Sequence, residues 1–133
     1  ALCQQLGLDN RINFCGFLER AELINRLCKS DLFILTSSVL PGSHEGFGIV
    51  YLEAAACGTP SLAARLAGAA EAVDDGTSGF FVETADIDSI ELALRQFLEG
   101  STSFEPQACQ TFARSFSWKD VAEQALPYYT SKP

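Results

Sequence analysis

The stretch Asp31–Ala64, DLFILTSSVLPGSHEGFGIVYLEAAACGTPSLAA, decides the fold of this 133-residue chain. A continuous apolar run over residues 31–37 has the length and composition of a central parallel strand that is covered on both faces. The Pro, Gly and Ser residues after it indicate a loop. A helix is expected over residues 48–57, because the Gly-Thr-Pro that follows is a helix stop. SLAA, at residues 61–64, is the next strand, so the stretch predicts a strand, a crossover helix and a parallel strand.

The rest of the chain continues this alternation of strand-like and helical runs. RINFCGF, at residues 11–17, is predicted to be a short buried strand, and the helix expected over residues 19–29 should pack on the sheet. A further strand is expected over residues 80–82, after an Asp-Gly turn, and helices over residues 107–116 and 117–129. The alternation is typical of the α/β class, here a Rossmann-like three-layer domain with a mostly parallel sheet.

Asp86–Gly100 predicts the most clearly amphipathic helix of the chain. Asp86 is a typical N-cap residue, and Gly100 is a typical residue for a helix end. The apolar residues at helical spacing are expected to face inward; they are Ile87, Ile90, Leu94, Phe97 and Leu98.

Length and composition favour one compact globular domain, since 47% of the 133 residues are hydrophobic. No apolar run has the roughly 18 residues of a membrane-spanning helix. The N-terminus lacks the basic start and long apolar core of a signal peptide, so a cytoplasmic location is expected. The net charge of −8 argues against nucleic acid or an anionic membrane as the main partner, because both need a basic face.

The five cysteines are an odd number and lie far apart in the sequence. They form no C-x-x-C pair and no cluster with histidine, which argues against a metal site or a disulfide framework. Free cysteine is among the residue types most often buried, so the five are expected to be reduced core residues.

Glu53 is the one ionisable side chain in the apolar helix expected over residues 48–57. An unpaired carboxylate buried in such a place would cost several kcal/mol. Glu53 therefore either reaches solvent at the edge of the domain or meets a polar partner. A solvent-facing side chain is the ordinary outcome for glutamate, but the residues just before the helix favour the second interpretation.

Glu45-Gly46-Phe47-Gly48 lies between a parallel strand and a helix N-terminus, where open α/β sheets place their ligands. The two glycines allow close approach of the backbone, and the first helix amides are free donors that suit a phosphate or diphosphate. Glu53, about one and a half turns into the helix, and Glu45, just before it, can accept hydrogen bonds from hydroxyl groups on either side. A nucleotide sugar has this shape, with a diphosphate between a ribose and a sugar.

Two other phosphate-binding motifs do not fit the sequence. The G-x-G-x-x-G dinucleotide fingerprint needs a third glycine where Tyr51 stands, and it needs a tight turn in place of the long loop before Gly46. A Walker A motif is excluded because the chain has no G-K-[ST].

The block EGFGIVYLEAAACGTP, residues 45–60, resembles the E-x7-E signature of retaining glycosyltransferases with the GT-B fold, the glycosyltransferase group 1 family. That group includes glycogen synthases, sucrose synthases and bacterial mannosyltransferases. The resemblance extends to RINFCGFLERAEL, SLAARLAGAAE and DDGTSGFFVE, and so covers nearly the whole chain. It implies a nucleotide-sugar donor and retaining transfer of a glycosyl group to an acceptor hydroxyl.

The resemblance also implies roles for individual residues. Glu45 corresponds to the catalytic-site glutamate that contacts sugar hydroxyls of the donor, and Glu53 corresponds to the glutamate that holds the ribose. No metal or other cofactor is expected, because the helix dipole and basic side chains neutralise the diphosphate. The remaining donor-binding residues implied by the resemblance are Gly46, Phe47, Gly48, Ile49 and Val50 at the helix start, Gly16 and Phe17 near the base, and Gly68 and Glu71 in the loop beside the donor.

The chain departs from the family pattern in three places. Its loop before Glu45 is longer than the commonest form, and residues 67–71 keep one glycine and the acid of the usual Gly-Gly-x-Pro-Glu but lose the proline. The strand and loop with the Arg and Lys that clamp the diphosphate are missing. The domain expectation is therefore a donor-binding domain over residues 1–116 without its N-terminal part, and a helix over 117–133 that packs toward an absent N-terminal acceptor domain.

This incompleteness predicts that the chain alone is inactive, because positive charge preorganised around the diphosphate is usually the main catalytic factor. Peripheral membrane association is expected only through the absent half. Two alternatives remain open: a non-catalytic, regulatory nucleotide-sugar-binding domain and a sugar-nucleotide epimerase. An upstream G-R-x-x-x-x-K-G-like segment would favour transfer over binding alone.

Several other side chains have two interpretations. His44 is either a solvated loop residue or a general acid. Arg65 approaches a phosphate or forms a surface ion pair. The aromatic side chains of Trp118, Tyr128 and Tyr129 form a sugar platform or, as the favoured interpretation, anchor a docking helix.

Overall fold

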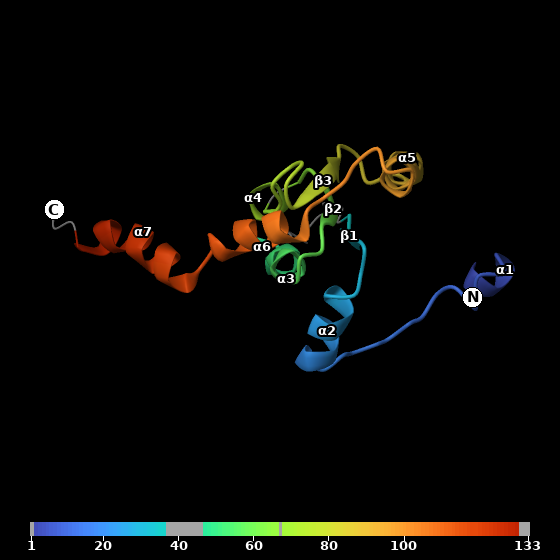
Figure 1. Ribbon diagram of the computed structural model, residues 1–133, viewed down its shortest axis with the longest axis horizontal. Coiled ribbons are helices and arrows are strands. Elements are labelled where there is room, and N and C mark those ends of the chain that lie inside the picture. The colour runs from blue at the N-terminus through green and yellow to red at the C-terminus, as the bar shows by residue number, and fades with distance from the viewer. Residues whose placement is uncertain (1, 37–46, 67, 131–133) are drawn as a thin grey trace, which may run out of the picture.

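The computed structural model describes residues 2–36, 47–66 and 68–130 as an α/β fold (Figure 1). Its described strands form one parallel three-stranded sheet in the order β1-β2-β3. These strands are β1 (Phe33–Leu35), β2 (Ser61–Ala64) and β3 (Gly79–Val82). The predicted α/β class and parallel sheet are confirmed.

The described helices include the five expected from the sequence, with ends that differ by a few residues. The described helices are α1 (Leu2–Gln5), α2 (Arg20–Leu27), α3 (Ile49–Ala56), α4 (Ala69–Ala72), α5 (Ile87–Leu98), α6 (Pro106–Arg114) and α7 (Trp118–Thr130). Within the described ranges, no helix has both the length and the apolar character that crossing a bilayer requires.

The three layers follow from the alternation of side chains along β2. Ala63 faces a cluster with Tyr51 of α3 and Val73 after α4, and α6 packs against α3 on this side. Leu62 and Ala64 face the opposite way, toward α5. β2 is therefore covered on both faces, and all four of its residues are buried.

The prediction that the strand within residues 31–37 is the central one is wrong for the described sheet. β2 has a partner on each side, whereas β1 pairs with β2 alone among the described strands. Ile34 in the middle of β1 is 45% exposed. An apolar run shows that a strand can be buried, but its position in the sheet depends on neighbours distant in sequence.

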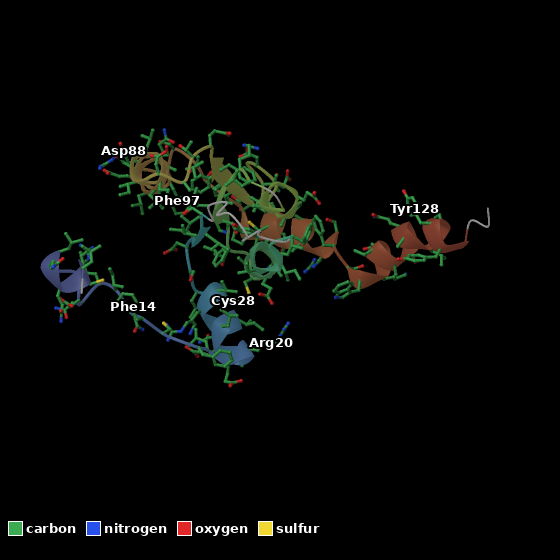
Figure 2. All side chains as sticks on the ribbon, turned by 180° about the vertical axis from the view of Figure 1, so that it is seen from behind. Phe14, Arg20, Cys28, Asp88, Phe97 and Tyr128 are labelled. Atoms are coloured by element: carbon green, nitrogen blue, oxygen red, sulfur yellow. The ribbon has the colours of Figure 1, made fainter. Side chains whose placement is uncertain are left out.

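Residues 11–17 do not form the predicted buried strand. They follow an extended path between α1 and α2, away from the sheet (Figures 1 and 2), and Phe14 and Phe17 are 80% and 90% exposed. A strand needs a hydrogen-bonding neighbour, and no described segment pairs with this one. α2 also differs from expectation, because it lies against the end of α3 and the Thr59 hydroxyl donates to the Leu27 carbonyl oxygen at 2.6 Å.

All five cysteines are free, as expected, but the prediction that they are core residues is mostly wrong. Cys109 is buried, Cys3 and Cys57 are partly buried, and Cys15 and Cys28 are exposed. Cys15 lies in the extended segment before α2, and Cys28 caps the end of α2. Phe14 and Phe17 around Cys15 are exposed as well, whereas Leu27 beside Cys28 is buried, so an apolar neighbour in the sequence does not decide whether a cysteine is buried.

Helix α5 has the predicted cap and part of the predicted inner face, since Ile90 and Leu94 pack on the core beside β2 and the Phe97 ring stacks on Phe80. The Ser89 amide donates to the Asp86 carboxylate at 2.8 Å, and Ala93 is the buried residue of the helix. Ile87 and Leu98, expected to face inward, are 83% and 81% exposed, because the described sheet is narrow and meets only the middle of α5.

The Asp86 cap leads to a prediction about acid stability. Hydrogen bonds from the Thr84 hydroxyl, the Ser89 amide and the Ser89 hydroxyl lower the pKa of Asp86 to about 2. Because the pKa in an unfolded chain is about 3.9, the ionised cap stabilises the fold above that value and its contribution is lost as the pH falls toward the folded pKa. We expect Asp86→Ala to lower the Tm at neutral pH, by an amount that shrinks between pH 4 and pH 2.

Thermal unfolding of both proteins across this pH range, followed by circular dichroism, measures the effect. Asp88→Ala is the matched control, because Asp88 is an exposed carboxylate in the same first turn that does not cap the helix (Figure 2). A Tm difference between wild type and Asp86→Ala that stays constant from pH 4 to pH 2 would contradict the prediction.

Candidate functional site

The N-terminus of α3 is shaped by a left-handed glycine. Gly48, the N-cap residue, has φ 77° and ψ 48°, a conformation that favours glycine. The Tyr51 amide donates to the Gly48 carbonyl oxygen at 3.0 Å. The amides of Ile49 and Val50 have no hydrogen-bond partner among the described residues. These two amides therefore remain available as donors at the positive end of the helix dipole.

Tyr51 holds this end of the helix at the carboxyl end of β1. Its side chain is buried, with 1% exposed, and its hydroxyl donates to the carbonyl oxygen of Leu35, the last residue of β1, at 2.7 Å. Its ring meets Phe33 edge-on at 5.9 Å between centroids. The start of α3 thus lies at the sheet edge where parallel α/β folds bind ligands, as the sequence predicts.

Glu53 lines a hollow of about 510 Å³ on the side of α3 away from the sheet. Its side chain is half-buried and makes no hydrogen bond or ion pair with any residue that the structure describes. The other lining residues, all apolar, are Phe47, Ile49, Leu52, Ala56, Ala113, Phe116, Trp118 and Val121. A carboxylate in apolar surroundings retains its capacity to accept hydrogen bonds from a polar molecule that enters.

The predicted site residues fall into three groups in the structure. Phe47, Gly48, Ile49, Val50 and Glu53 lie together at the start of α3. Gly68 is the N-cap of α4 and Glu71 lies within α4, which packs beside α3. Gly16 and Phe17 lie in the exposed extended segment before α2 (Figure 1). Glu45, Gly46 and His44 lie outside the described residues.

Arg65 has an ion-pair role. Its guanidinium contacts Asp75 at 2.5 Å and Glu83 at 2.8 Å, and it lies 4.2 Å from the centre of the Phe81 ring. The hydrogen bonds to Asp75 and then Glu83 raise the pKa of Arg65. Of the two interpretations of Arg65, the structure favours the surface ion pair over a phosphate contact.

Three residues beside Glu53 were not identified as site residues from the sequence. Ala113 lies in α6, Val121 lies in α7 and Phe116 lies between these helices, all more than fifty positions after Glu53. The ring of Phe116 contacts Phe47 at 5.7 Å and Phe112 at 5.1 Å between centroids. The Phe112 and Phe116 pair at helical spacing was the available signal for this aromatic contact, although α6 ends at Arg114 and Phe116 follows its cap residue.

The aromatic residues of α7 are separated in the structure. Trp118 lines the hollow with Glu53 yet is 84% exposed, while Tyr128 and Tyr129 are each 86% exposed near the other end of the helix (Figure 2). In the described part of the chain, no group of three or more His, Cys, Asp or Glu residues is placed to hold a metal ion.

Comparison with known proteins gives a consistent result. The sequence model of the family described as "Glycosyl transferases group 1" matches residues 1–115. D-inositol 3-phosphate glycosyltransferase of Mycolicibacterium smegmatis is 33% identical over 129 residues, which cover 97% of this chain and 29% of that protein. Glycogen synthase of Mycobacterium tuberculosis is 34% identical over 124 residues, which cover 87% of this chain and 28% of that protein.

A solved structure shares the fold. The crystal structure of Anabaena Alr3699/HepE in complex with UDP and glucose superimposes with a TM-score of 0.77 at 29% identity, over 98% of this chain and 35% of that chain. The chain thus spans less than a third of the length of these two curated relatives.

Proposed function

This chain belongs to the glycosyl transferases group 1 family, and from that premise we propose that it forms part of the nucleotide-sugar site of a glycosyltransferase. The enzyme would transfer a hexosyl group from a nucleoside diphosphate sugar to an acceptor hydroxyl, with retention at the anomeric carbon. The similar Anabaena structure contains UDP and glucose, which supports a uridine nucleotide as the first donor to test.

The observation that carries the proposal is the half-buried Glu53, which has no described partner and lines a hollow one turn beyond Ile49. In the proposed complex, the amides of Ile49 and Val50 donate to the diphosphate at the positive end of the helix. Glu53 accepts hydrogen bonds from the ribose hydroxyls. Glu45 does the same for hydroxyls of the sugar.

The remaining parts of the reaction would come from outside these residues. The acceptor site and the basic side chains that clamp the diphosphate would belong to an N-terminal half of the protein, with which α7 would pack. The helix dipole and those basic side chains would neutralise the leaving diphosphate without a metal ion. We further propose a cytoplasmic location, and we expect no sugar transfer by the present chain alone.

The proposal is tested by calorimetric titration of the chain with UDP, GDP and ADP. A hydrogen bond to a charged group contributes about 1.5–3 kcal/mol, so Glu53→Ala is expected to weaken binding of the preferred nucleotide by roughly 10- to 100-fold. The effect should be absent with the matched control Glu91→Ala, because Glu91 is exposed on α5, across the sheet from α3.

Two results would count against this role. Equal binding by wild type and Glu53→Ala would remove Glu53 from the ribose site. No binding of any of the three nucleotides by a folded wild-type chain at millimolar concentration would mean that the start of α3 does not hold a diphosphate by itself.

A further inference from the structure

Two cysteines cap helices that meet end to end, on a part of the molecule that the proposed function does not use. Cys28 is the C-cap residue of α2, and Cys57 is the C-cap residue of α3. The Cys28 amide donates to the Ile24 carbonyl oxygen at 2.9 Å, and the Cys57 thiol approaches the same oxygen with Sγ at 3.9 Å. The Cys57 sulfur therefore lies against the last turn of α2, beside Cys28.

Thr59 fixes the two helix ends relative to each other. Its hydroxyl donates to the Leu27 carbonyl oxygen at 2.6 Å, and Oγ1 lies 3.3 Å from the carbonyl oxygen of Ser30. These two carbonyls lie on either side of Cys28 along the chain, and Thr59 follows Cys57 by two residues. Thr59 itself is buried, so this contact is part of the packed structure.

The pKa of Cys57 reflects the contact between the two side chains. Burial, a hydrogen bond with the Cys28 side chain and the charges of Cys28 and Glu53 together raise the pKa of Cys57 to about 11. Cys57 therefore remains a thiol at neutral pH. Cys28 is exposed (Figure 2), so an oxidant reaches it from solvent.

We propose that Cys28 and Cys57 are a redox-active dithiol that a peroxide converts to an intramolecular disulfide. The Cys28 sulfur attacks one peroxide oxygen, the O–O bond breaks, and Cys28 becomes a sulfenic acid as water leaves. The Cys57 sulfur then attacks the Cys28 sulfur, the S–O bond breaks, and a second water leaves with the Cys57 proton. Two thiols lose two electrons and two protons in all, and one peroxide is reduced to two waters.

The other cysteines lie in different surroundings. Cys109 is buried and its thiol donates to the Thr77 carbonyl oxygen at 3.5 Å. Cys15 is exposed and its thiol contacts the Asn13 carbonyl oxygen at 3.6 Å, within its own extended segment. Cys15 is therefore a suitable control, being accessible to the same oxidant without a thiol placed to complete a disulfide.

A Cys28–Cys57 bond would change the coupling between α2 and the rest of the fold. α2 has few contacts with the described structure besides those at its last turn (Figure 1). A covalent link there closes a chain loop, which lowers the entropy of the unfolded state. It also anchors α3 one turn beyond Glu53. The dithiol can form this bond whether or not the start of α3 binds a nucleotide.

The test is oxidation of the chain with hydrogen peroxide, followed by alkylation of free thiols and peptide mapping by mass spectrometry. We expect a disulfide-linked peptide joining Cys28 to Cys57, and a fall in free thiols from the five of the reduced chain. The disulfide should raise the Tm by roughly 5–10 °C, and a dithiol reductant should reverse the rise.

Three variants make the result specific. Cys15→Ser should keep the disulfide and the reversible Tm rise, whereas Cys28→Ser and Cys57→Ser should lose both. The peptide map of wild type needs no variant and decides the matter if a serine variant fails to fold. The proposal is overturned if wild type yields no Cys28–Cys57 peptide, or if oxidation stops at sulfinic acids on separate cysteines.

Discussion

Gly79→Ala is expected to destabilise the chain by about 3 kcal/mol or more, among the largest effects of any single substitution. A Cβ at Gly79 would lie 2.2 Å from the carbonyl oxygen of Ser61 and 2.8 Å from Cγ1 of Val73. Gly79 and Ser61 are register partners in β3 and β2. The oxygen belongs to the backbone of the central strand, so it can move only if the two strands separate.

Urea denaturation monitored by circular dichroism measures this loss, and a double-mutant cycle with Val73→Ala identifies its cause. Shortening Val73 removes the side-chain contact but leaves the backbone contact with Ser61. We therefore expect Val73→Ala to restore little of the stability lost in Gly79→Ala. The interaction free energy between the two substitutions should be less than about 1 kcal/mol. Full rescue by Val73→Ala, or a Gly79→Ala chain as stable as wild type, would show that β2 and β3 are not packed this closely.

The elements of this fold that the sequence predicts well are those with local signals. The cap of α5 is one such case, because Asp86 reaches the amide of Ser89 within a single turn. The stop after α3 is another, since Gly58 and Pro60 follow it directly. Such contacts join residues a few positions apart, so the spacing of residue types is enough to place them.

The sheet shows where local patterns fail. Residues 31–37 form a longer apolar run than residues 61–64, yet β1 lies at the edge of the described sheet and the short β2 lies at its centre. Residues 11–17 have a strand-like composition but no described partner. Burial of a strand is decided by segments far away in the sequence, and these are not visible in the strand itself.

The candidate site was predictable in part for a similar reason. Glu53 stands out in the sequence because it is a lone carboxylate in an apolar helix, and the structure gives it a hollow and no described partner. The wall opposite Glu53 was not predictable, because Phe116 and Val121 reach it through the packing of α6 and the position of α7. The meeting of Cys28 and Cys57 likewise depends on how α2 ends against α3.

Gly48→Ala is the substitution expected to affect both the fold and the candidate site. An alanine at φ 77° costs roughly 1–2 kcal/mol. Its Cβ would also lie 2.7 and 2.8 Å from two atoms of the Tyr51 ring. That ring cannot easily yield, because it is buried and its hydroxyl is bonded to the Leu35 carbonyl oxygen at 2.7 Å. We therefore expect Gly48→Ala to lower the free energy of unfolding by about 3–4 kcal/mol. The part beyond the backbone cost comes from the contact with the Tyr51 ring.

Gly76→Ala separates these two causes, because Gly76 has φ 81° and open space where its Cβ would stand. In urea denaturation, the free energy of unfolding of Gly76→Ala should fall by the backbone cost alone, roughly 1–2 kcal/mol. The difference between the losses in Gly48→Ala and Gly76→Ala then measures the contact with Tyr51. If Tyr51 moves to relieve that contact, the amides of Ile49 and Val50 move with the first turn of α3. Gly48→Ala should therefore also weaken nucleotide binding, whereas Gly76→Ala should leave it unchanged. Equal losses of stability in the two variants would mean that the ring gives way freely, and the start of α3 would then be too loosely held to present its amides to a diphosphate.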